Sequence, residues 1–269
     1  MSIGSDFVAV PVGPMLAVET ATRSAYVGIF DVDGQPLALA HQTADRHSAG
    51  LLTLCDRLFH QTQLSPKHLA AIACGAGPGS FTGLRVGMAM AKGLALPFNT
   101  PLLLVSSLHT LACDLAALPE AETATCFVPC IDAGKGELHA QLFSPSAHGP
   151  IAQEGAWRLS PEALCERVAT LASNAVTQMA APAVGALVLM GGPGLGKFSQ
   201  LGAFAGTCPH GISVKLDVAG PSAVSLAALA HKALAQGNVQ DLATSAPTYG
   251  RLPDITQPKR KIVGPGDTR

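Results

Sequence analysis

Three short runs near the start of the chain, at 15–19, 24–30 and 36–41, are mostly apolar and bounded by polar residues. Short apolar runs of this kind are typical of β-strands, and the Asp33-Gly34 pair between the last two runs is a strong signal for a hairpin turn. The sequence therefore predicts a strand followed by a β-hairpin.

The period changes after Ser48, which is suited to cap a helix. Five apolar residues then recur at helical spacing and define one face of a helix over 47–61: Leu51, Leu52, Cys55, Leu58 and Phe59. Next, "AAIACGAG" indicates a short buried strand, "GLRVGMAMAKGLALPF" a helix ending at 98, and "PLLLVSS" a second buried strand.

The second half repeats this order. In "CFVPCIDAGKGELHAQLF" a strand ends at Asp132, and a glycine turn leads into a strand from Glu137. In the first half a strand ends at Glu19, and a Thr-rich turn leads into a strand from Ser24. A helix at 160–173, a strand at 184–192 and a helix from Pro221 to Gly237 should follow. The pattern predicts two related α/β halves.

The predicted division follows from these patterns. No obvious flexible linker separates the halves, and a boundary near 105–115 divides them best. The expected segments are an N-terminal extension at 1–14, a first half at 15–112, a second half at 113–257 whose helix 221–236 can pack back on the first, and a flexible tail at 258–269.

Composition narrows the functional classes. Charged residues make up 13% of the chain and the net charge is −1, so no Lys/Arg block suggests a nucleic-acid groove. No apolar run is long enough to span a bilayer, the start does not resemble a signal peptide, and the seven cysteines form no CxxC pair. We expect a cytoplasmic protein with reduced thiols and no membrane contact, which meets any nucleic acid through a partner.

The stretch GAGPGSFTGLRVGMAMAKG at 75–93 looks like a phosphate-binding loop. A dinucleotide fingerprint would need glycine where Ser80 or Thr82 stands, and a P-loop would need a lysine that is absent. We therefore expect a turn from strand to helix, capped by Ser80 or Thr82. Helical glycines cost on the order of 1 kcal/mol each, so a bare helix face suggests that another helix approaches it.

The stretch GGPGLGK at 191–197 matches the Gly-x4-Gly-Lys spacing of a P-loop. Phe198 stands where Ser or Thr would hold magnesium, and Pro193 removes a backbone donor. We favour a turn here, although Gly192, Gly194 and Lys197 could line a nucleotide cleft. The nine histidines include no HExxH motif and no pair three or four residues apart, so the residues nominate no catalytic or metal-binding set.

Several motifs together resemble the TsaB family, also called YeaZ. Similarity is strong over 15–112 and thin over 140–220, and Gly134 and Gly250 depart from the family pattern. The motifs are "LAVETAT" (16–22), "RHSAGLL" (46–52), "GPGSFTGLRVGMAMAKGLA" (77–95), "VSSLHTLA" (105–112) and "PTYGR" (247–251).

The resemblance implies an actin/Hsp70/sugar-kinase-like fold of two ribonuclease-H-like halves. It also implies a role in forming N6-threonylcarbamoyladenosine (t6A) beside the anticodon of tRNAs that read codons beginning with A. In that pathway the paralogue TsaD transfers the threonylcarbamoyl group, and the ATPase TsaE joins the complex. TsaD carries a His-x3-His metal pair, whose positions match Ser107 and Leu111 here. A leucine cannot ligate a metal, so the resemblance implies a non-catalytic scaffold or activator.

Family members associate through the two helices that match 47–61 and 83–98, with themselves or with TsaD. The expected interface residues are Leu51, Leu52, Cys55, Gly83, Val86, Gly87, Met90 and Ala91, unless they face only their own sheet. We expect no cofactor of the chain's own, with ATP or ADP held at an interface with partners. The open alternatives are an enzyme of the same fold, either a small-molecule kinase or a glycoprotease-like hydrolase, and a nucleotide-binding module that uses Lys197.

Overall fold

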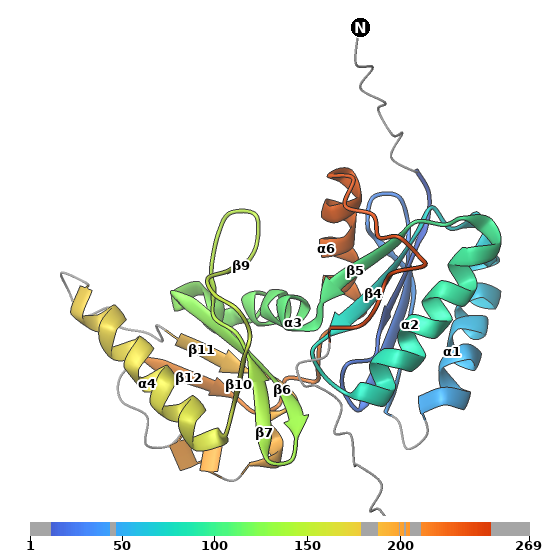
Figure 1. Ribbon diagram of the computed structural model, residues 1–269. Coiled ribbons are helices and arrows are strands. Elements are labelled where there is room, and N and C mark those ends of the chain that lie inside the picture. Colours follow the sequence, from blue (N-terminus) through green and yellow to red (C-terminus); the bar gives the residue numbers. More distant parts are fainter. Residues whose placement is uncertain are drawn as a thin grey trace, which may run out of the picture.

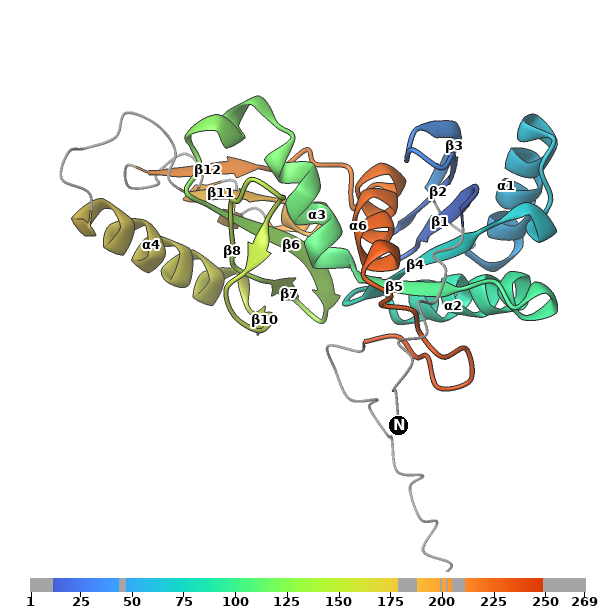
Figure 2. The ribbon, with the colours of Figure 1, turned by 90° about the horizontal axis from the view of Figure 1, so that it is seen from above.

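The computed structural model describes residues 12–43, 47–178, 188–198, 200–201, 203–204 and 211–248. Two α/β halves lie side by side, each built on its own sheet (Figures 1 and 2). The predicted extension up to residue 11, the segment around Tyr249 and the predicted tail at 258–269 lie outside the described residues.

The first sheet has the strand order β3-β2-β1-β4-β5. Strands β1, β2 and β3 pair antiparallel, whereas β1, β4 and β5 pair parallel. At the β2–β3 hairpin, Asp31 Oδ1 accepts the backbone N–H groups of Asp33 and Gln35, and Gly34 has a φ of +78°. The predicted hairpin is confirmed. The strands are β1 (Met15–Glu19), β2 (Ser24–Phe30), β3 (Pro36–Thr43), β4 (Ala71–Gly77) and β5 (Leu102–Ser106).

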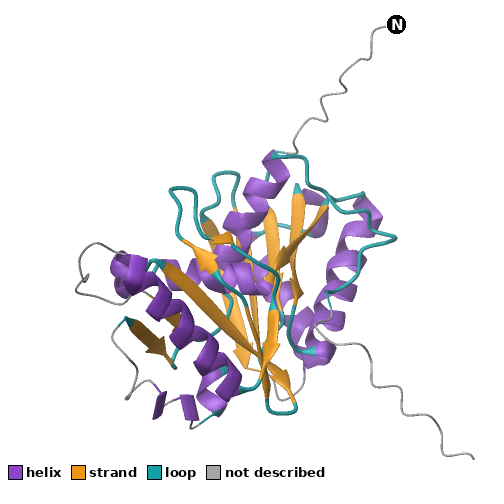
Figure 3. Cartoon of the chain, turned by 60° about the vertical axis from the view of Figure 1, so that its left-hand side comes forward, coloured by secondary structure: helices purple, strands orange, loops and turns teal. Residues whose placement is uncertain are grey.

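Helices cover both faces of this sheet (Figure 3). On one face, α1 (His47–Thr62) and α2 (Phe81–Ala95) pack their apolar residues on the strands. On the other face lies α6 (Ala223–Ala235), whose Leu226, Ala227 and Ala230 contact Met15 and Leu103. Thus a helix from the end of the described chain completes the core of the first half.

The second sheet has the order β10-β7-β6-β11-β12, the same arrangement as the first sheet. Strands β6, β7 and β10 pair antiparallel, and β6, β11 and β12 pair parallel. The repeated topology confirms the predicted actin/Hsp70/sugar-kinase-like fold of two ribonuclease-H-like halves. The elements are β6 (Cys126–Gly134), β7 (Glu137–Ala140), β8 (Phe143–Ser144), β9 (Ile151–Ala152), β10 (Trp157–Leu159), α4 (Pro161–Gln178), β11 (Val188–Gly191) and β12 (Ile212–Lys215).

Helix α3 (Ser107–Ala116) joins the halves and was not predicted from the sequence. Its Leu108, Leu111 and Leu115 pack on the second sheet, although the helix follows the last strand of the first. It also contacts the start of α6. The Asp114 carboxylate accepts hydrogen bonds from the backbone N–H and the hydroxyl of Ser222, which caps α6. The predicted boundary between residues 112 and 113 falls inside this helix.

The element ends differ in detail from the predictions. Helix α6 begins after Ser222, whose hydroxyl accepts the Ser225 N–H, so Pro221 precedes the cap rather than opening the helix. The strand predicted at 184–192 is observed over Val188–Gly191, and 184–187 lie outside the described residues. Short 3-10 helices that the sequence pattern did not indicate are η1 (Pro66–His68), η2 (Leu96–Phe98), η3 (Pro119–Thr123) and η4 (Leu195–Lys197).

Candidate functional site

Helices α1 and α2 run side by side on the outer face of the first sheet (Figure 1). Between them lies a hollow of about 460 Å³. Leu52 stands at its edge and is 61% exposed, and nothing lies within 4 Å of the position that a Cβ of Gly93 would occupy. The side chains that line this hollow are apolar: Leu51, Leu52, Val86, Ala89, Met90 and Leu94, with Gly93 between them.

A second hollow of about 640 Å³ continues the first toward the end of α1. Leu52 and Leu94 line both hollows, and the far end of the second reaches Ser65 and Pro66. We call the two hollows together the α1–α2 furrow. The second hollow is also lined by polar side chains, among them Thr53, Asp56, His60 and Gln63. The exposed Leu52 beside the apolar first hollow is a feature of surfaces that bind another protein.

Six of the eight predicted interface residues follow the furrow or its floor. Leu52, Val86 and Met90 reach the surface, and Leu51 lines the furrow although it is 3% exposed. Cys55 is buried, with its thiol 3.6 Å from the Met90 sulfur, and burial raises the pKa of this thiol to about 12. Ala91 is fully buried in the core beneath. Of the eight predicted interface residues, Leu52, Val86 and Met90 are therefore the ones that reach the surface.

Gly83 and Gly87 require a correction. Both are buried, and a Cβ at Gly83 would lie 2.1 Å from the backbone oxygen of Thr20. A Cβ at Gly87 would lie 2.3 Å from Thr20 Oγ1. These glycines therefore make room for the β1–β2 turn of the same chain, not for a partner's helix. The start of the glycine-rich stretch 75–93 is as predicted, because Ser80 caps α2 by accepting the Gly83 N–H.

A buried carboxylate lies where β1 ends. Glu19 is fully buried and accepts hydrogen bonds from the Ser107 hydroxyl and the Ala21 N–H, both at 2.8 Å. The Ser107 oxygen in turn accepts the Gly77 N–H at 3.2 Å. Burial raises the pKa of Glu19 from 4.5 to about 7, and these hydrogen bonds oppose the rise. Sequence reasoning noted this acidic strand end only as part of the repeat.

Ser107 and Leu111, which the resemblance sets against the metal pair expected in TsaD, make other contacts here. The Ser107 hydroxyl is already shared between Glu19 and Gly77. Leu111 is fully buried, and its Cδ2 would lie 2.9 Å from a Cβ at Gly192. In the part of the chain that the structure describes, no three His, Cys, Asp or Glu side chains are grouped closely enough to hold one ion.

The predicted nucleotide-cleft residues come together at the end of β6. A Cβ at Gly192 would lie 2.1 Å from the Cys130 backbone oxygen, and one at Gly194 would lie 2.7 Å from the Asp132 nitrogen. The Lys197 ammonium forms an ion pair with the Asp132 carboxylate. The loop thus packs on its own strand, and its lysine charge is balanced within the chain.

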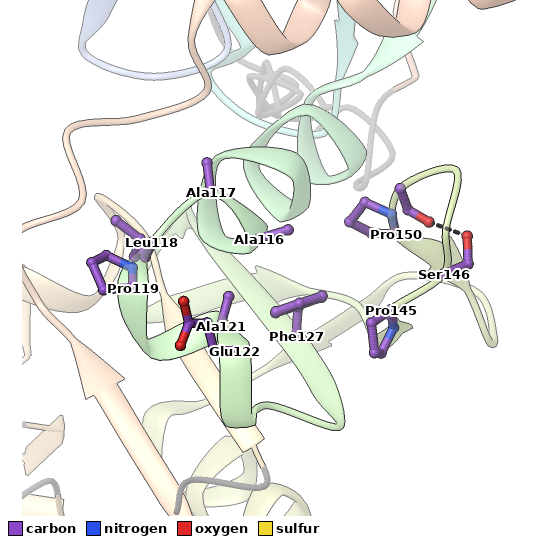
Figure 4. A pocket seen from close by; sticks show the side chains of 11 residues that line it. Ala116, Ala117, Leu118, Pro119, Ala121, Glu122, Phe127, Pro145, Ser146 and Pro150 are labelled. Atoms are coloured by element: carbon purple, nitrogen blue, oxygen red, sulfur yellow. Dashed lines mark hydrogen bonds between the residues drawn. The ribbon is translucent and has the colours of Figure 1, made fainter.

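A separate hollow of about 480 Å³ lies between the end of α3 with η3 and the β8–β9 hairpin (Figure 4). Its lining is mainly alanine and proline around Phe127, with Glu122 as the carboxylate. The hairpin is held in place by His109, whose Nε2 lies 2.8 Å from the Pro150 oxygen. None of the site residues predicted from the sequence lines this hollow.

Among the helices that the structure describes, none has the length and apolarity needed to cross a membrane.

The chain is similar in sequence to proteins of tRNA threonylcarbamoyladenosine formation. The family model of TsaD, tRNA N6-adenosine threonylcarbamoyltransferase, matches residues 40–145. The tRNA threonylcarbamoyladenosine biosynthesis protein TsaB of Escherichia coli K12 is 32% identical over 164 residues, which cover 61% of this chain and 69% of that protein. The TsaB protein of Haemophilus influenzae is 29% identical over 145 residues, covering 54% of this chain and 60% of that protein.

Solved structures show the same fold. YeaZ from Pseudomonas aeruginosa superposes with a TM-score of 0.67 at 23% identity, covering 88% of this chain and all of that one. At 23% identity the superposition shows only that the fold is shared, and the family assignment rests on the E. coli relative. The chain belongs to the TsaB (YeaZ) family of tRNA threonylcarbamoyladenosine biosynthesis proteins.

Proposed function

We propose that this chain is a non-catalytic scaffold or activator subunit of the complex that forms t6A next to the anticodon of tRNAs reading ANN codons. It acts by forming a heterodimer with TsaD, and it pairs with itself when TsaD is absent. TsaE joins the assembly, and tRNA is met through the complex.

One observation carries the proposal: the α1–α2 furrow leaves Leu52 61% exposed beside other apolar side chains, within the segment that matches the TsaD family model. Exposed apolar area of this kind is costly in water and is stabilised when a partner covers it. A paralogue with the same half-fold offers a helix pair of similar shape, which suits pairing across a pseudo-twofold axis.

The non-catalytic part of the proposal is supported by what fills the two positions of the paralogue's metal pair. The Ser107 oxygen is hydrogen-bonded to Glu19 and Gly77, and Leu111 belongs to the core. Lys197 is neutralised by Asp132. We therefore place any bound ATP or ADP at an interface with partners.

Reconstitution tests this proposal. Purified TsaD and TsaE, supplied with threonylcarbamoyl adenylate and ATP, would be assayed for threonylcarbamoyl transfer to tRNA, with and without this chain. We expect transfer only with the chain present. In Leu52→Glu, affinity for TsaD should fall at least about tenfold, because a charge would be buried without a partner.

Leu39→Glu is the matched control, because Leu39 is 49% exposed on β3, on the side of the molecule away from the furrow. It should leave both TsaD binding and transfer unchanged. Full transfer by TsaD and TsaE without the chain would refute the activator role. Transfer by the chain alone would refute the non-catalytic part.

A further inference from the structure

The hollow between the end of α3, η3 and the β8–β9 hairpin combines apolar side chains with one carboxylate (Figure 4). Its volume of about 480 Å³ is in the range of hollows that hold ligands. The buried Phe127 forms part of the lining, and most of the other side chains that line it belong to alanine and proline. These side chains offer contact to an aliphatic group that leaves water.

The hollow also favours positive charge. Glu122 lines it, and in the part of the chain that the structure describes no lysine, arginine or histidine forms an ion pair with this carboxylate. Helix α3 ends at Ala116, and both Ala116 and Ala117 line the hollow, so the partially negative end of the helix is presented there. Among the described residues that line it, none is a lysine, arginine or histidine.

The hairpin wall of the hollow is held in place from behind. His109 of α3 lies with its Nε2 2.8 Å from the Pro150 oxygen. Lys232 of α6 donates to the His148 oxygen at 2.6 Å, and it is not one of the residues that line the hollow. A wall fixed by two other elements loses little conformational freedom when a ligand binds, so the hollow is prepared for an occupant.

The rim of the hollow indicates what kind of occupant fits. Ala117, Pro119 and Pro145 are exposed there, so a small free amine inside the hollow would leave these apolar side chains in water. A protein segment covers the rim while one of its side chains enters. Lysine joins four methylene groups to a compact charge, which suits apolar walls and the carboxylate of Glu122, whereas the arginine fork presents five donors that need more acceptors.

We propose that this hollow binds a lysine side chain of another protein. The stem packs on Phe127 and the alanines, and the ammonium group lies at Glu122 and the end of α3. The hollow is lined by α3 and residues of the second half, whereas the α1–α2 furrow belongs to the first half. A protein at the hollow therefore need not displace one at the furrow, and the inference does not rest on the role in t6A formation.

A nuclear magnetic resonance titration tests the proposal. The full chain, labelled at its alanine methyl groups, would receive the peptide acetyl-Gly-Gly-Lys-Gly-Gly-amide at up to about 10 mM, the range in which weak contacts saturate. We expect the methyl signals of Ala116, Ala117 and Ala121 to shift, and that of Ala89 in the furrow to stay unchanged. The same peptide with uncharged norleucine in place of lysine should bind about threefold more weakly. Absence of these shifts, or equal affinity of the two peptides, would overturn the proposal.

Variants and a free amine locate the recognition. Glu122→Gln should weaken the lysine peptide about threefold and leave the norleucine peptide unchanged. Glu166→Gln is the matched control, because Glu166 is an exposed residue of α4 that does not line the hollow, and it should change neither affinity. If n-butylamine binds as tightly as the lysine peptide, the hollow recognises free amines and the assignment to a protein is wrong. Sedimentation of Glu122→Gln should show unchanged self-association, and a tenfold weakening would instead assign the hollow to a second copy of the chain.

Discussion

Ser107 donates its hydroxyl hydrogen to Glu19 Oε2 over 2.8 Å, and so ties the first residue of α3 to the last residue of β1. Because α3 packs on the second sheet, this bond connects the core of one half to the strand that organises the other. The same serine oxygen accepts the N–H of Gly77, the last residue of β4. Ser107, which the family resemblance matched to a metal-binding histidine of TsaD, is thus a structural junction in this chain.

Glu19 should make the chain less stable as the pH rises. Its pKa is about 7 in the folded chain against 4.5 ordinarily, so between these values the folded state binds more protons than the unfolded state. The unfolding free energy therefore falls as the pH rises from 4.5 to 7, by at most about 3 kcal/mol. Glu19→Gln should gain stability relative to the natural chain by up to that amount between pH 5 and pH 8.

Urea denaturation at several pH values measures this difference. Glu122→Gln serves as the control for removing one carboxyl at an exposed position. A Glu19→Gln variant whose stability follows the natural chain in parallel across this pH range would show that Glu19 does not titrate as described.

Removing the serine hydroxyl should also weaken the junction. In Ser107→Ala the Glu19 carboxyl loses one donor and the Gly77 N–H loses its acceptor, both in buried surroundings. We expect a loss of about 1–3 kcal/mol, measured by urea denaturation. In the double variant with Glu19→Gln, the change in unfolding free energy should differ from the sum of the two single changes, because the residues share one network. Additive changes would mean that the two groups act independently.

The fold could be predicted from the sequence wherever local patterns decide it. The short apolar runs and the Asp33-Gly34 turn located the first hairpin, and the repeated strand–turn–strand order indicated two related halves. Helix α3 was missed because β5 runs directly into it without glycine or proline between them. The available signal was Ser106, which caps the helix by accepting the His109 N–H.

Only part of the candidate site could be predicted from the sequence, because its contacts join residues that are distant in sequence. Helical spacing brought Leu52 and Met90 to the correct helices, and both line the furrow. The bare face at Gly83 and Gly87 was also recognised, but a sequence does not state which element will approach such a face. That element is the turn at Thr20, some 60 residues earlier.

Lys197 should matter little for stability and for nucleotide binding by the isolated chain. Its ion pair with Asp132 is partly exposed, with side-chain exposures of 41% and 31%, so solvent screens it. Lys197→Ala should cost less than about 1 kcal/mol. Calorimetric titration with ATP should give the same result for the variant and the natural chain. Nucleotide binding that is present in the natural chain and lost in the variant would instead favour a nucleotide-binding module.

Two glycines of α2, Gly87 and Gly93, should respond to alanine in opposite ways. At Gly87 the new methyl group would lie 2.3 Å from Thr20 Oγ1, so the β1–β2 turn or the helix must shift. We expect Gly87→Ala to lose about 1–3 kcal/mol of unfolding free energy. At Gly93 the methyl group meets nothing within 4 Å, and Gly93→Ala should gain about 0.5–1 kcal/mol from helix propensity.

Denaturation of both variants measures the contrast, and Thr20→Ala identifies its cause. Truncating Thr20 removes the hydroxyl and methyl groups that crowd Gly87, so the double variant should recover much of the loss caused by Gly87→Ala. It should leave the effect of Gly93→Ala unchanged. If Gly87→Ala is tolerated as well as Gly93→Ala, then the β1–β2 turn does not need the close approach, and the glycines of α2 require a different explanation.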